Sequence, residues 1–153
     1  MVIMSDELYS NAVLRMAADI PRIGRLHNPH ASARKVSRMC GSEVEVDLML
    51  KSGRIADLAL RVKACALGQA SAAVLARNAI GASVADLTKA RDALAAMLKK
   101  GQLGPKGRFA ELKLLESART YPARHQSILL AFDAACEAAK TASATRTVTP
   151  QTG

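Results

Sequence analysis

The stretch Glu43–Lys63, EVEVDLMLKSGRIADLALRVK, decides the fold. In its first half, apolar residues occupy the even-numbered positions from Val44 to Leu50 and alternate with mostly charged residues. This period-two pattern is typical of a half-buried strand. Gly53 marks a turn, because glycine adopts positive φ without steric cost. A second alternating run covers Ile55–Lys63, so the stretch predicts an antiparallel hairpin.

Outside the hairpin, the sequence predicts one more strand and several helices within a single domain. The strand is expected over Ala33–Met39. Ser5 is expected to cap the first helix, and Ser83 with Asp86 to cap a later one. The predicted helices span residues 6–18, 69–80, 84–100, 109–118 and 124–142. We predict one domain over residues 1–142 and a disordered tail rich in Thr and Ser over 143–153.

The composition is that of an ordinary globular protein. The 153 residues suit one domain, 50% are hydrophobic and 23% are charged. The sequence has no run of about 18 uncharged apolar residues, which a membrane span would need. The first residues lack the basic and apolar regions of a secretory signal, so we predict a cytoplasmic protein.

The net charge of +9 raises the question of nucleic-acid binding. The basic residues are spread from Arg15 to Arg146, and aromatic residues make up only 3% of the chain, which leaves few rings to stack on bases. We therefore favour a solvated basic surface that can dock an acidic protein partner.

The hairpin brings two of the three cysteines into register. If the apolar even-numbered positions share one buried face, the numbers of two residues that face each other across the hairpin add up to an even value near 104 or 106. Cys40 then lies within one residue of facing Cys65. Facing residues have Cβ atoms about 4.5–5.5 Å apart, so one metal ion or cluster could contact both sulfurs.

Both cysteines have neighbours that suit a ligand site. Gly41 leaves room beside Cys40 for a cofactor or partner. Cys65 precedes a predicted helix, whose N-terminal N–H groups favour a thiolate. Two buried cysteines that pack as small hydrophobes explain the spacing equally well, so both interpretations stay open.

The remaining cysteine and the loop histidines favour simpler explanations. Cys136 lies among alanines in the middle of a predicted helix, and we interpret it as a packing residue. His27 and His30 flank Asn28-Pro29, where a surface loop is favoured over a metal site.

The residues around the cysteines resemble the IscU/NifU-type iron–sulfur scaffold family over about residues 8–140. The matching segments are Cys40-Gly41, Gly53-x-Ile55-x-Asp57, Cys65 leading into Ala70-Ser71, Ile20-Pro21-Arg22 with Gly24, and Leu130-Ala131-x-Asp133-Ala134. The resemblance implies an α+β fold with a small antiparallel sheet of about three strands. It also implies an N-terminal helix and several helices packed on one side of the sheet.

A predicted extra helix around Arg108–Ala118 resembles the insertion of the SufU branch of this family. SufU-like relatives bind zinc and accept persulfide sulfur from a cysteine desulfurase, so the resemblance to this branch implies the same chemistry here. IscU-type relatives build a [2Fe–2S] cluster. We therefore expect iron or a [2Fe–2S] cluster as cofactor, alternatively zinc. The expected partners are a cysteine desulfurase and cluster-accepting apoproteins.

The chain departs from the family's ligand pattern at two positions. The family's acidic ligand falls on Ser42, and its third cysteine falls on Ser127, which follows Gln126. Neutral serine binds iron and zinc poorly, and a zinc site normally takes three or four protein ligands. A small shift of the alignment brings Gln126 or His125 to the ligand position. The implied ligand set is Cys40, Cys65 and His125, with Ser42 and Ser127 as weak members.

Three functions fit this pattern. We expect a scaffold or carrier for iron or an iron–sulfur cluster, rather than an enzyme. The alternatives are a sulfur acceptor that uses Cys65 for a persulfide, with zinc or without metal, and a docking module without metal chemistry. A hydrolase is disfavoured, because the sequence has no nucleophile elbow, no H-E-x-x-H motif and no phosphate-binding glycine loop.

Overall fold

A computed structural model describes residues 10–39 and 41–148 of the protein. The predicted hairpin forms as β2 (Glu43–Lys51) and β3 (Arg54–Lys63), which pair antiparallel. Val44 lies opposite Val62 and Leu48 opposite Leu58, so that opposed residue numbers sum to 106. This confirms one of the two predicted registers. A bulge between Met49 and Leu50 shifts the pairing close to the turn.

The third strand, β1 (Ala31–Val36), pairs antiparallel with β2 and gives the sheet order β1-β2-β3. The predicted strand, Ala33–Met39, was placed too far along the chain. The pairing ends where Val36 faces Glu43, because the chain then turns. The N–H of Ser37 donates to the carbonyl of Ser42 at 2.7 Å and closes this connection.

The first described helix, α2 (Asn11–Ala18), starts later than predicted. Ser10 has an extended backbone, and its hydroxyl accepts a hydrogen bond from the N–H of Val13 at 3.3 Å. This residue therefore caps the helix. Ser5, which was predicted as the cap, lies outside the described residues.

The later helices are α3 (Ala66–Asn78), α4 (Val84–Lys100), the 3-10 helix η1 (Gly107–Thr120) and α5 (Pro122–Val148). The predicted cap of α4 is confirmed, since Ser83 and Asp86 form a reciprocal capping box. The helix α5 continues through part of the predicted tail, and residues 149–153 lie outside the described residues. No helix among the described residues has the length and apolar character to cross a bilayer.

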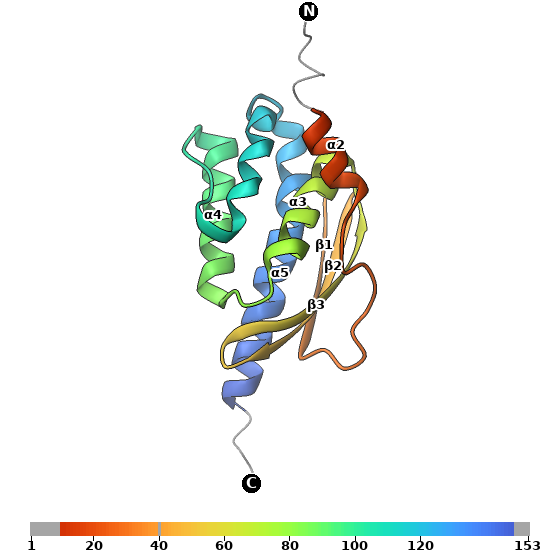
Figure 1. The fold of residues 1–153 in the computed structure, drawn as a ribbon, viewed down its shortest axis with the longest axis vertical. Coiled ribbons are helices and arrows are strands. Elements are labelled where there is room, and N and C mark those ends of the chain that lie inside the picture. The colour runs from red at the N-terminus through yellow and green to blue at the C-terminus, as the bar shows by residue number, and fades with distance from the viewer. Residues whose placement is uncertain (1–9, 40, 149–153) are drawn as a thin grey trace, which may run out of the picture.

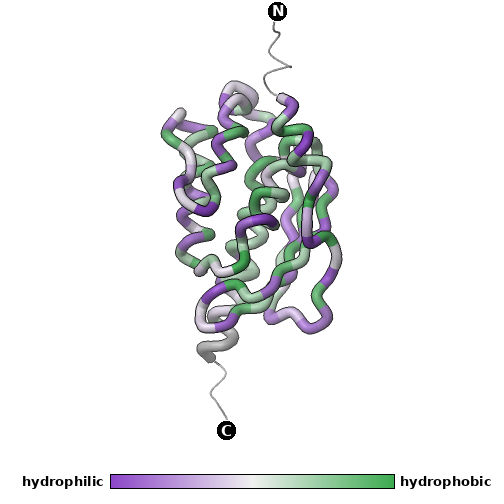
Figure 2. The backbone as a smooth tube through the Cα atoms, in the orientation of Figure 1, coloured by the Kyte–Doolittle hydropathy of each residue, from purple (hydrophilic) through white to green (hydrophobic). Residues whose placement is uncertain are grey.

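The elements form layers, with α3 and α5 against one face of the sheet and α4 and η1 outside them (Figure 1). Hydrophobic segments follow the strands and α3, where these layers meet (Figure 2). Val44, Val46 and Leu48 are fully buried, as the alternating pattern predicted. The predicted α+β fold with helices on one side of a three-stranded sheet is confirmed.

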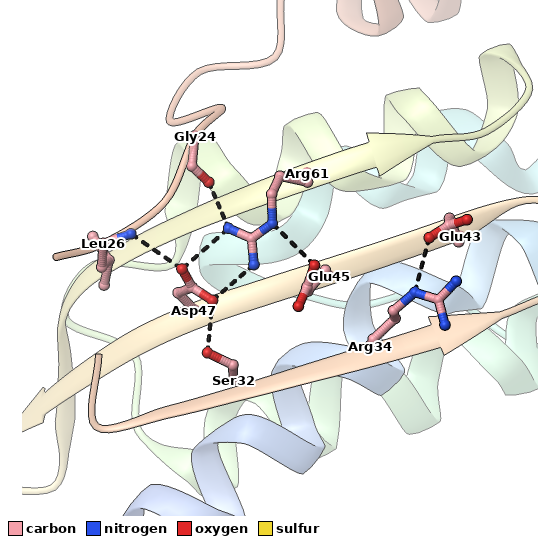
Figure 3. A network of polar contacts seen from close by, with 8 residues as sticks. All are labelled: Gly24, Leu26, Ser32, Arg34, Glu43, Glu45, Asp47 and Arg61. Carbon is pink, nitrogen blue, oxygen red and sulfur yellow. Dashed lines mark hydrogen bonds and ion pairs between the residues drawn. The ribbon is translucent and has the colours of Figure 1, made fainter. Parts of the chain in front are cut away.

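The segment of residues 20–30 covers part of the other face of the sheet, around Asp47 and Arg61. Gly24 donates its N–H to the carbonyl of Leu60 at 3.0 Å, next to a bridge between Ile23 and Leu60. Under this segment, Asp47 is only 4% exposed and forms an ion pair with Arg61 (Figure 3). The sequence pattern had placed Asp47 on a solvated face, so its burial is a finding of the tertiary structure.

Candidate metal or sulfur site

Cys65 lies at the junction between β3 and α3. It is the N-cap residue of α3, with extended backbone angles of φ −68° and ψ 171°. Its side chain is partly exposed, and no acidic residue occupies the first turn of the helix. The N–H groups at a helix N-terminus attract negative charge, so this position suits a bound sulfur species or metal–thiolate group.

Next to Cys65 lie two buried serines from distant parts of the chain, of which one contacts Cys65 and the other contacts the first serine. Ser127 on α5 has its Oγ 3.5 Å from the Sγ of Cys65, and the same hydroxyl donates to Ser42 Oγ at 3.3 Å. Ser127 is 1% exposed and Ser42 is 4% exposed. These serines are the two residues that the resemblance placed at ligand positions of the family. Ser127 supplies a hydroxyl oxygen beside the sulfur, and Ser42 lies next to Ser127.

Close packing of α3 on α5 at this point requires glycine at position 68. A Cβ atom on Gly68 would lie 2.7 Å from Ser127 Oγ and 2.9 Å from Ala64 Cβ. Real side chains essentially never approach so closely, so any larger residue must push the two helices apart. The sequence analysis missed this residue. The signal was a glycine in the first turn of an alanine-rich helix, a position where glycine otherwise costs stability.

The second predicted ligand, Cys40, lies outside the described residues, and its pairing with Cys65 stays a prediction. Its neighbour Gly41 has φ +69°, a conformation that glycine adopts readily. The N–H of Gly41 donates to the carbonyl of Ser37 at 2.9 Å. A Cβ built on Gly41 meets no described atom within 4 Å, in accord with the predicted open space.

His125 lies on another side of α5, away from Ser127. Its Nε2 is 3.0 Å from the carbonyl oxygen of Ala118 and 3.1 Å from that of Arg119. Residues two positions apart on a helix are separated by about 200° around its axis, so His125 and Ser127 point in opposite directions. The ligand role predicted for His125 beside Cys65 does not fit this placement. Gln126, the other alternative, accepts a hydrogen bond from Ser37 Oγ at 3.1 Å.

The other cysteine and the loop histidines occupy structural positions. Cys136 is 7% exposed within the core, and burial raises the pKa of its thiol. His30 accepts a hydrogen bond from the N–H of Leu50 through Nδ1 at 3.0 Å, beside the β2 bulge, and His27 is exposed. Among the residues that the structure describes, no group of three or more His, Cys, Asp or Glu side chains is placed to hold a metal ion.

A three-stranded sheet with helices on one face and a cysteine at the strand–helix junction defines a distinct class of small α+β proteins. The chain belongs to the NifU-like N terminal domain family, whose family model matches residues 8–128. A curated relative, the iron-sulfur cluster assembly scaffold protein IscU of Thermotoga maritima, is 26% identical over 133 residues. This alignment covers 87% of the present chain and 93% of the relative.

Two solved structures show the same fold. The N-terminal part of a nitrogen-fixing NifU-like protein from Brucella abortus superimposes with a TM-score of 0.91 and is 46% identical. The match covers 93% of this chain and 99% of that one. A putative iron-sulfur cluster assembly scaffold protein for the SUF system from Fervidobacterium islandicum AW-1 has a TM-score of 0.80 at 21% identity. This match covers 88% of the present chain and 98% of the other one. The second likeness concerns the fold alone.

Proposed function

We propose that this protein is an iron–sulfur cluster assembly scaffold or carrier, which holds iron or a [2Fe–2S] cluster as cargo through Cys65 and Cys40. The observation that carries the proposal is the convergence of Cys65, Ser127 and Ser42 at the start of α3. Membership of the NifU-like family and the relative named as an IscU scaffold support it. A cysteine desulfurase and cluster-accepting apoproteins are the proposed partners, in the cytoplasm.

The donor set favours cargo that is held weakly. The described donors are one thiol and two hydroxyl groups, and neutral hydroxyl groups are poor ligands for iron and zinc. With Cys40 as second thiolate, the site still lacks the three sulfur or nitrogen ligands of a stable zinc site. Such a site suits a cluster that passes on to another protein. Zinc is the less favoured occupant.

Anaerobic reconstitution with ferrous iron and sulfide tests the proposal. The wild-type protein should develop the charge-transfer absorption of a cluster, and Cys65→Ser and Cys40→Ser should abolish most of it. Cys136→Ser is the matched control, because this cysteine is buried in the core away from the proposed site. If the wild type gains no such absorption, or if Cys65→Ser gains as much as the control, the scaffold proposal is wrong.

A sulfur-acceptor role is the second candidate, favoured by the partial exposure of Cys65. In this reaction the Cys65 thiolate would attack the outer sulfur of a desulfurase persulfide, and the desulfurase thiolate would leave. Cys65 would then carry one additional sulfur atom, visible by mass spectrometry after incubation with a desulfurase and cysteine. An unmodified Cys65 would exclude this role without affecting the reconstitution result.

A further inference from the structure

A cavity of about 850 Å³ opens between the end of α4 and the start of α5. These ends meet the end of η1 at the same end of the molecule (Figure 1). The volume lies in the range of about 300–1,000 Å³ that is usual for small-molecule sites. The residues that line it include His125 but not Cys65 or Ser127. The cavity is therefore separate from the site described above.

The charges in this cavity are not balanced. Arg91 and Asp133 both line it and pair with each other at 2.7 Å. Lys99, Lys100 and Arg119 line it as well, and none of the three forms an ion pair with a described carboxylate. Three cations around one hollow give a positive potential that attracts anions.

The guanidinium of Arg119 lies next to the end of α4. It lies against Gly101, in the space that a Cβ on Gly101 would fill. Gly101 ends α4 in the left-handed conformation, with φ +67°. The guanidinium is thus placed beside Lys99 and Lys100 in the last turn of this helix. A guanidinium held in this way can bind carboxylate or phosphate oxygens in bidentate fashion.

A largely buried histidine adds an acceptor atom that no described residue donates to. His125 is only 7% exposed and lines the cavity. Carbonyl oxygens only accept hydrogen bonds, so the Nε2 that contacts Ala118 and Arg119 must carry the hydrogen. A neutral ring then leaves Nδ1 as an acceptor, and no described residue donates to it. Among the described buried side-chain atoms only Ser71 Oγ lacks a partner, so Nδ1 of His125 is open to solvent, and a hydroxyl group of a ligand could donate to it in place of water.

The start of α5 also borders the cavity. Pro122 lines the cavity at the first position of this helix, and the first turn of the helix contains no acidic residue. The positive end of the α5 dipole therefore offsets the negative ends of α4 and η1, which lie at the same cavity. The described residues that line the cavity include no Phe, Tyr or Trp, so its only aromatic ring is the imidazole of His125.

We propose that this cavity binds a compact multivalent anion bearing phosphate or carboxylate groups. The cation cluster formed by Lys99, Lys100 and Arg119 supplies the charge, and Nδ1 of His125 accepts a hydrogen bond from a hydroxyl group of the ligand. The absence of a Phe, Tyr or Trp ring among the described lining residues favours a compact anion over a nucleotide. The site does not depend on Cys65 or on a bound cluster.

Isothermal titration with sodium pyrophosphate and, separately, sodium citrate tests the proposal at constant ionic strength. At least one of the two anions should bind the wild-type protein at a single saturable site, and the comparison shows whether the cavity prefers phosphate or carboxylate. The double variant Lys99→Gln/Arg119→Gln should weaken this binding by at least about tenfold, since it removes two charged donors. Lys51→Gln/Lys113→Gln removes the same charge outside the cavity and should change it little.

The outcomes separate this proposal from the proposed cluster function. Cys65→Ser should bind the anion as well as the wild type does, even though it loses the cluster. Thermal melts of both double variants should show that they fold. The proposal is overturned if neither anion binds, if both double variants weaken binding equally, or if Cys65→Ser abolishes it.

Discussion

Replacing Asp47 by Asn should measure how strongly the segment of residues 20–30 is held on the sheet. Asp47 accepts hydrogen bonds from Ser32 Oγ at 2.6 Å, from the N–H of Leu26 at 3.1 Å and from both terminal nitrogens of Arg61 (Figure 3). Burial by itself would raise the pKa of Asp47, but the hydrogen bonds from Arg61, Ser32 and Leu26 outweigh it and lower the pKa from 3.8 to about 2.

The magnitude follows from this shift. A pKa lowered by roughly 2 units corresponds to about 2.5 kcal/mol of stability that depends on the ionised carboxylate. We expect Asp47→Asn to lower the free energy of unfolding by about 2–3 kcal/mol at pH 7. Because the folded-state pKa is the lower one, this contribution is complete above about pH 4 and disappears as the pH falls through 2.

Urea unfolding of both proteins between pH 7 and pH 2 provides the measurement. The difference in unfolding free energy between wild type and Asp47→Asn should be largest at neutral pH and should shrink as the pH falls below about 4. Other carboxylates titrate in the same range, but they are common to both proteins and cancel in the difference. Hydrogen exchange at the amide of Leu26 should also be faster in the variant.

The matched control is Glu43→Gln, which removes the same charge from the same strand. Glu43 pairs with Arg34 at 2.9 Å, but the side chains of Arg34 and Glu43 are 55% and 34% exposed to solvent. Exposed ion pairs contribute little, so the control should be much less destabilised than Asp47→Asn. Equal effects of the two substitutions, or a difference for Asp47→Asn that does not change with pH, would refute the assignment of this network.

Three further predictions concern the site and the core. Gly68→Ala should destabilise the protein by about 1–3 kcal/mol in thermal or urea unfolding, because the new Cβ would collide with Ser127 and Ala64. An unchanged or higher stability would contradict the close packing of α3 on α5. Ser127→Cys adds a third thiol to the proposed site, where Oγ now lies 3.5 Å from Cys65 Sγ, and it should slow the loss of a reconstituted cluster to a chelator. Burial raises the pKa of the Cys136 thiol, whereas Cys65 is partly exposed. Iodoacetamide at pH 8 should therefore alkylate Cys65 faster than Cys136. Equal alkylation rates, measured by peptide mass spectrometry, would argue against this burial.

The sequence analysis located the site only in part. It identified Cys65 at a strand–helix junction, and it named Ser42 and Ser127 as the positions that replace ligands. It placed His125 with them, although helical periodicity separates His125 from Ser127 by about 200°. Gly68 was missed because its importance depends on how closely α3 approaches α5, and no local pattern encodes that distance.

By itself the sequence determined the local structure of this protein. Alternating residues limited β2 and β3 to two registers, of which the structure has one. The Ser83–Asp86 pair and Gly101 marked the limits of α4. Such signals act between residues that are near in the chain or directly opposed. The tertiary structure alone decided that Asp47 is buried and that Ser127 meets Cys65. Both depend on where a segment distant in sequence comes to lie, and the alternation of a single strand cannot show whether its polar face is covered.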